Sequence, residues 1–83
     1  MRYSLNISER AVVQLRALPK DIRRNIGMRL EFLCENLQGD VLKLKPATNR
    51  YRLRVGSFRI LFTLEKDRIF VHLVKDRKDA YRD

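Results

Sequence analysis

The sequence YRLRVGSFRI, at residues 51–60, alternates charged and apolar side chains on both sides of a glycine–serine pair. Such alternation is typical of strands with one buried face. Glycine followed by serine suits a two-residue type II′ turn, because glycine readily takes the positive φ angle of the first turn position. The turn predicts a β-hairpin of defined register, with the facing pairs Val55–Phe58, Arg54–Arg59, Leu53–Ile60, Arg52–Leu61 and Tyr51–Phe62.

The two faces of this hairpin differ in chemistry, because opposed residues share a face. The apolar face carries Tyr51, Leu53, Val55, Phe58, Ile60, Phe62 and Leu64. The basic face carries Arg50, Arg52, Arg54, Arg59, Leu61 and Thr63. Like charges directly opposite each other destabilise a strand pair by about 0.2–1 kcal/mol. A phosphate held between the guanidinium groups of Arg54 and Arg59 would offset this cost; the alternative is a solvated polar face that happens to use arginine.

The rest of the chain supplies a strand and two helices before this hairpin. Residues 2–7 alternate as a half-buried strand does, and Ser8 is a suitable N-cap for a first helix that ends at Pro19. A second helical repeat follows Pro19 and is expected to stop at Gly39. Residues 40–50 are expected to form a connection, and three strands follow at about residues 50–55, 58–64 and 69–74.

This order predicts an α+β fold: a strand, a helix pair that covers one sheet face, and a three-stranded antiparallel meander. We expect one domain over residues 1–83, since the chain has room for a single modest core. If residues 65–68 form a tight connection, the last strand adds Ile69, Val71 and Leu73 to the apolar face. Its other residues, Phe70, His72 and Val74, then join the basic face.

The charge of the chain indicates an anionic partner. Lys and Arg outnumber Asp and Glu by 19 to 10, a formal net charge of +9. Nucleic acid is the first candidate, an acidic protein the second and an anionic membrane surface the third, although the charge could also serve solubility alone. No apolar stretch reaches the ~20 residues that span a bilayer. The single cysteine allows no internal disulfide, so we expect a cytoplasmic protein.

Few residues could carry catalysis. One His and one Cys do not make a zinc site, and no glycine-rich phosphate loop is present, so neither a metal nor a cofactor is expected. His72 is a possible proton carrier, because the histidine pKa lies near neutrality; it could equally be an ordinary strand residue. Tyr81 lies among basic tail residues and could stack on a nucleobase, or could anchor the tail to the core.

Two segments resemble the RelE/ParE toxin superfamily of bacterial and archaeal toxin–antitoxin modules. The stretch LKLKPATNRYRLRVGSFRILFTL is similar to the K-L-K-G…Y-R-L-R-V-G-D-Y-R segment of that family, and VKDRKDAY is similar to its V-G-H-R-R-D-V-Y ending. The resemblance implies a RelE-like α+β fold and cleavage of mRNA on the ribosome, by attack of a 2′-hydroxyl on the adjacent phosphorus. It also implies a cognate RelB-like antitoxin, wrapping the toxin with an acidic segment in a hetero-oligomer.

On this basis nine basic residues and one tyrosine receive a predicted role. The predicted catalytic residues are Arg54, Arg59, Arg77 and Tyr81. The predicted RNA-binding residues are Lys43, Lys45, Arg50, Arg52, Lys75 and Lys78. Some members of the family have lysine where this chain has Arg52 and Arg54, and arginine does not act as a base. The base would then be Tyr81, His72, a carboxylate such as Asp76 or Asp79, or a group of the RNA or the ribosome.

Two other functions remain open at this point. A ParE-like protein would inhibit DNA gyrase and cut no RNA. A non-catalytic relative would bind nucleic acid, or serve as a scaffold for its antitoxin, with an affinity that falls steeply as salt rises.

Overall fold

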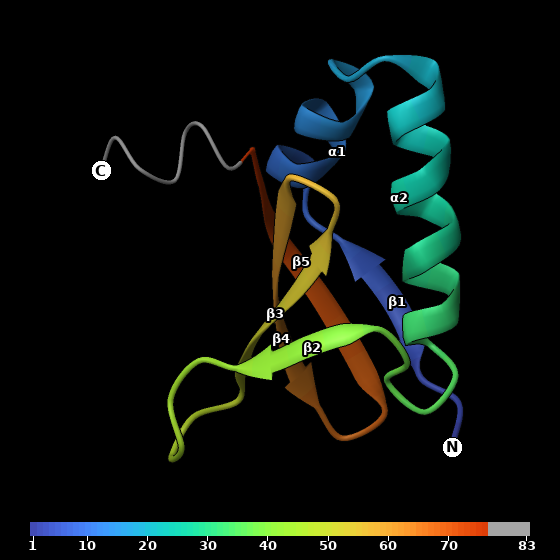
Figure 1. The fold of residues 1–83 in the computed structure, drawn as a ribbon. Coiled ribbons are helices and arrows are strands. Elements are labelled where there is room, and N and C mark those ends of the chain that lie inside the picture. The colour runs from blue at the N-terminus through green and yellow to red at the C-terminus, as the bar shows by residue number, and fades with distance from the viewer. Residues whose placement is uncertain (77–83) are drawn as a thin grey trace.

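The computed structural model describes residues 1–76 as two helices and a five-stranded sheet with strand order β1-β5-β4-β3-β2. The helices are α1 (Glu9–Arg16) and α2 (Lys20–Leu33). The strands are β1 (Ser4–Ile7), β2 (Asp40–Lys43), β3 (Arg50–Val55), β4 (Phe58–Glu65) and β5 (Arg68–Asp76). Figure 1 shows both helices on the same side of the sheet, with α2 running alongside β1. The predicted α+β fold, with a helix pair over one sheet face, is confirmed.

The β3–β4 hairpin has the predicted register, with Arg54 opposite Arg59 and Leu53 opposite Ile60. Gly56 takes a φ angle of +57°, whereas Ser57 is not among the non-glycine residues with positive φ. Positive φ at the first turn position alone is the mark of a type II′ turn. The glycine–serine pair therefore sets which side chains share each face of the sheet.

The core lies between the helices and the apolar face of the hairpin. Leu53, Ile60 and Phe62 are at most 1% exposed, and Ile26, Leu30 and Leu33 of α2 are at most 2% exposed. Ala11, the buried residue of α1, lies one turn after Ser8, whose side-chain oxygen accepts a hydrogen bond from the Ala11 backbone nitrogen at 3.1 Å. The N-cap thus fixes where α1 begins and which of its residues face the core.

The sheet has one strand more than expected, and α2 is shorter. Residues 40–43, taken as part of a connection, form β2, which pairs antiparallel with β3 at the sheet edge. The helix ends at Leu33 instead of running to Gly39, because Asn36 and Leu37 take positive φ angles and turn the chain back. Gly39 serves a different purpose: its backbone lies so close to Leu53 that a Cβ would be 2.8 Å from the Leu53 Cδ1 atom.

The side chains of the last strand lie on the predicted faces of the sheet only in the first half of the strand. The tight connection exists, with Glu65 opposite Arg68, but a β-bulge shifts the pairing so that Leu61 faces Leu73 while Phe62 faces Val71. His72 is the extra residue, and every position after it changes face. Val74 is therefore buried, at 7% exposed, and Leu73 joins the basic face, the reverse of the prediction.

Candidate nucleic-acid interface

The sheet face opposite the helices is organised in three rows that run across the strands. Throughout, this face is called the open face. The first row contains Asp40, Arg54, Arg59 and Lys75, each paired with the next by strand register. The second row contains Leu42, Arg52, Leu61 and Leu73. The third row contains Arg50, Thr63 and Phe70.

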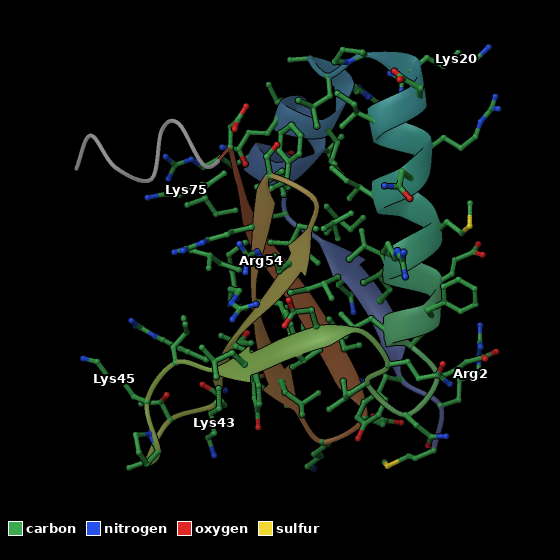
Figure 2. The ribbon with its side chains drawn as sticks, in the orientation of Figure 1. Arg2, Lys20, Lys43, Lys45, Arg54 and Lys75 are labelled. Atoms are coloured by element: carbon green, nitrogen blue, oxygen red, sulfur yellow. The ribbon has the colours of Figure 1, made fainter. Side chains whose placement is uncertain are left out.

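The first row, called the cationic row, gathers positive charge over three adjacent strands. Arg59 lies between Arg54 on one side and Lys75 on the other, and both arginines are exposed. Among residues 1–76, neither Arg54 nor Arg59 has a carboxylate within ion-pair distance. Figure 2 shows Arg54 and Lys75 on the side of the sheet away from α2. Exposed guanidinium groups held side by side can bind a phosphate with several charge-assisted hydrogen bonds.

Arg52 differs from its neighbours because it is already paired. Its Nη1 atom donates to the Asp40 carboxylate at 3.3 Å and to the Asp40 backbone oxygen at 3.2 Å. The side chain is only 16% exposed, so its aliphatic part packs on the sheet. Arg52 is thus held in place within the open face, with less of its charge available to a ligand than Arg54 or Arg59 has.

A hollow of about 470 Å³ lies beside the second and third rows. It is lined by Arg10, Leu44, Arg50, Tyr51, Leu61, Phe62, Thr63, His72 and Leu73. The Thr63 hydroxyl and the His72 Nε2 atom are hydrogen bonded at 2.8 Å. His72 thus lines the hollow together with Leu61, and its hydrogen bond places its ring at Thr63, the residue paired with Arg50.

Lys43 and Lys45 lie apart from the cationic row. The Lys43 Nζ atom lies 5.8 Å from the centre of the Tyr51 ring, and that ring stacks on Phe62 with centroids 5.4 Å apart. Register places Lys43 opposite Tyr51, on the helix side of the sheet. Lys45 follows β2 and is exposed (Figure 2). A ligand that contacts these lysines and the cationic row would have to pass around the β2 edge.

Comparisons with known proteins converge on one family. The profile described as "ParE toxin of type II toxin-antitoxin system, parDE" matches residues 5–81. Toxin RelE3 of Methanocaldococcus jannaschii is 36% identical over 76 residues, which is 84% of this chain and 85% of that protein. This chain belongs to the RelE/ParE superfamily of type II toxins.

Solved structures agree with this assignment. The RelB–RelE antitoxin–toxin complex from Methanococcus jannaschii contains a chain that is 31% identical to this toxin, with a TM-score of 0.77. The alignment covers 93% of this toxin and 95% of that chain. The archaeal RelE–RelB complex from Pyrococcus horikoshii OT3 gives 26% identity, a TM-score of 0.78 and coverage of 93% and 97%. The profile is named for ParE, whereas these relatives are RelE proteins.

Several of the predicted site residues of the toxin come together and others do not. Arg54, Arg59 and Lys75 share the cationic row, and Arg50 and Arg52 lie in the next two rows. The predicted residues Arg77, Lys78 and Tyr81, together with Asp79, lie outside the described residues. Asp76, another candidate base, is opposite Phe58, which places it on the helix side of the sheet.

Two features of the open face, the ion pair of Arg52 and the hollow, were not predicted from the sequence. Asp40 pairs with Arg52 because β2 is a strand, and the alternation in DVLK at residues 40–43 was a weak signal for it. The hollow depends on Leu73 and His72 pointing to the same side, which requires the bulge. No residue type in β5 marks a bulge at that point, so the sequence held no clear signal.

Among residues 1–76, no three His, Cys, Asp or Glu side chains cluster as metal ligands do. Neither helix in that range is long and apolar enough to cross a bilayer.

Proposed function

We propose that this toxin is an endoribonuclease that cleaves mRNA on the ribosome, in the cytoplasm, without a metal or cofactor. The observation that supports it is the pairing of Arg54 with Arg59 on the exposed face of the sheet. Folding gains nothing from this arrangement, whereas a phosphate gains two guanidinium partners. The RelE names of the relatives point the same way.

In this mechanism the 2′-hydroxyl of one nucleotide attacks the adjacent phosphorus. A 2′,3′-cyclic phosphate forms, and the bond to the 5′-oxygen of the next nucleotide breaks. Arg54 and Arg59 would stabilise the negative charge of the phosphorane, a contribution whose loss typically slows a reaction about 10²–10³-fold per donor removed. The ribosome would supply the orientation that an open sheet face does not.

The proton of the 2′-hydroxyl needs an acceptor other than the arginines, which stay protonated. His72 is poorly placed for this step. Its partner Thr63 is four residues from Arg59 along β4, about 13 Å at about 3.3 Å per residue. We therefore assign the acid–base steps to Tyr81 or to a group of the RNA or the ribosome, and not to His72.

A RelB-like antitoxin is the proposed protein partner, as in the two archaeal complexes above. The cationic row would attract an acidic segment of such a partner, and the two proteins would form a hetero-oligomer. Because charge pairs on an exposed surface are screened by salt, this association should weaken as ionic strength rises.

The test is primer extension on a reporter mRNA in a reconstituted translation reaction, with and without ribosomes. The toxin is compared with Arg59→Ala and with Arg24→Ala, a matched loss of charge at an exposed position of α2. We expect new ends within codons only when ribosomes are present, lost in Arg59→Ala and retained in Arg24→Ala. Intact message under every condition would exclude the nuclease and favour one of the two alternatives raised by the sequence, gyrase inhibition or binding without cleavage.

A further inference from the structure

The hollow on the open face has no part in the cleavage chemistry proposed above. Leu61 and Leu73, paired across β4 and β5, contribute apolar surface to it, and the hydrogen-bonded Thr63 and His72 contribute polar atoms. Arg10 and Arg50, which also line it, add positive charge. The volume, about 470 Å³, lies within the roughly 300–1,000 Å³ typical of small-molecule sites.

The bulge in β5 is what brings these groups together. In a regular strand His72 and Leu73 would point to opposite faces. Here both line the hollow, because His72 is the extra residue of the bulge. Helix α1 braces this segment: the Ser8 hydroxyl donates to the His72 backbone oxygen at 3.1 Å, and the Val74 backbone nitrogen donates to the Gln14 side-chain oxygen at 2.8 Å. Bulges commonly re-aim side chains near functional sites.

The hollow also lies at a suitable distance from the cationic row. Leu61 is two residues from Arg59 on β4, a separation of about 6.6 Å at about 3.3 Å per residue. Thr63 is two residues further on. A sugar can bridge a phosphate at Arg59 and a base over Leu61, which leaves the base edge facing Thr63 and His72.

We propose that the hollow binds the base of a nucleotide that flanks the phosphate held at Arg54 and Arg59, and that Thr63 and His72 determine which base is preferred. The inference rests on the proposed function, since it takes single-stranded RNA as the ligand. An apolar surface suits the flat face of a base, and proteins read unpaired bases by hydrogen bonds to their edges. Both groups keep hydrogen-bonding capacity beyond their mutual bond. If the Thr63 hydroxyl donates to Nε2, its oxygen can still accept and the His72 Nδ1–H can donate; if Nε2–H donates, the hydroxyl can still donate and Nδ1 can accept.

The first experiment sequences the 5′ ends that the toxin produces from a message with randomised codons in reconstituted translation. The variants are Thr63→Val, which keeps the shape and removes the hydroxyl, Thr63→Ser, which keeps the hydroxyl, and His72→Gln. We expect Thr63→Val to change the base preference at one position next to the cut by about 2- to 12-fold, the worth of one neutral hydrogen bond. Thr63→Ser should keep the original preference.

An unchanged preference in both Thr63→Val and His72→Gln would overturn the inference. If these variants also bound an antitoxin more weakly, the hollow would be assigned to the protein partner instead.

The second experiment needs no ribosome and separates this inference from the proposed nuclease. The four ribonucleoside 5′-monophosphates are titrated against toxin with ¹³C-labelled leucine methyls, and ribose 5-phosphate serves as the control without a base. We expect saturable shifts of the Leu61 and Leu73 methyls that differ among the bases and are absent with ribose 5-phosphate. If these shifts are seen but the protein cuts no RNA in the cleavage assay, the base site is supported while the nuclease is excluded. Equal shifts with ribose 5-phosphate, or none at millimolar nucleotide, would overturn the base site.

Discussion

The two faces of the sheet use the same strands for opposite purposes. Beneath the helices, Leu53, Ile60 and Phe62 are almost completely buried, and their packing holds the fold together. On the open face, Arg54 and Arg59 are exposed side by side and repel each other. We therefore expect neighbouring residues of one strand to differ in what their loss costs: stability on the buried face and, under the function proposed above, RNA binding on the open face.

The largest expected effect is on the buried face. Ile60→Ala removes a fully buried side chain, and we expect it to lower the free energy of unfolding by about 2–5 kcal/mol. Its neighbour Arg59→Ala should change stability by no more than about 1 kcal/mol, because effects at surface positions are small and relief of the repulsion from Arg54 is of that size at most. Chemical denaturation of both variants, followed by circular dichroism, checks this. Similar losses in the two variants would contradict the division of roles between the faces.

A substitution in the helix layer can raise the stability of the protein without changing any residue of the sheet. Gly27 is exposed in the middle of α2, and a Cβ added there would meet no atom within 4 Å apart from its chain neighbours and the backbone of its own helix. Gly27→Ala should therefore raise the free energy of unfolding by about 1 kcal/mol, the difference in helix propensity. The thermal midpoint should rise accordingly, while the chemistry of the open face is unaffected. A lower midpoint would mean that the glycine is needed for a reason that packing does not reveal.

A smaller gain is expected from relieving repulsion on the open face. Arg59→Gln keeps much of the length of the side chain and removes the central charge of the cationic row. Stability should rise by about 0.2–1 kcal/mol at low salt, and the gain should shrink at high salt because the repulsion is screened. Denaturation at two ionic strengths measures the gain in stability and its decrease with salt, with Arg24→Gln as the matched control. A loss of stability at low salt would show that the arginines do not repel each other.

The smallest effect concerns the thiol at the end of α2. Burial raises the pKa of Cys34 above its ordinary value of 9.0, while Arg2 lowers it and Glu31 and Glu35 raise it. The folded state therefore holds this proton more tightly than the unfolded chain. The resulting stability is complete below pH 9 and is lost as the pH rises toward the folded-state pKa.

Unfolding measured between pH 8 and 10 tests this expectation, with Cys34→Ala as the control that lacks the thiol. The decline should be steeper in the natural protein than in Cys34→Ala. Parallel declines would mean that other groups cause the pH dependence.

Local rules predict the hairpin and the helix starts but not the edges of the sheet. Gly56 fixes the register through its own φ angle, and Ser8 caps α1 through a hydrogen bond three residues away, so both can be read from neighbouring residues. Strand β2 is short, and its residues pair with partners 8 to 14 positions further on, so its four residues carry little signal alone. The bulged segment around His72 is hydrogen bonded to Ser8 and Gln14, which are 64 and 60 residues away in the sequence from their partners, so its surroundings cannot be read from neighbouring residues.

The same distinction applies to the candidate site. The Arg54–Arg59 pair follows from the turn and was predicted correctly as a pair, while its role in cleavage remains a prediction. The hollow and the ion pair between Asp40 and Arg52 could not be predicted in this way. They depend on where β2 and the bulge in β5 lie, and neighbouring residues do not specify either position.

The position of β5 has a consequence for the cell that makes this toxin. Strand β1 is made first, yet its partner in the sheet is β5, with Ser4 paired to Arg68. The sheet cannot close until residues 68–76 have left the ribosome, because β5 also lies between β1 and β4. A partly made chain presents an unfinished open face, in which Arg59 still lacks its neighbour Lys75. The open face is thus complete only after β5, the last strand to be synthesised, has joined the sheet between β1 and β4.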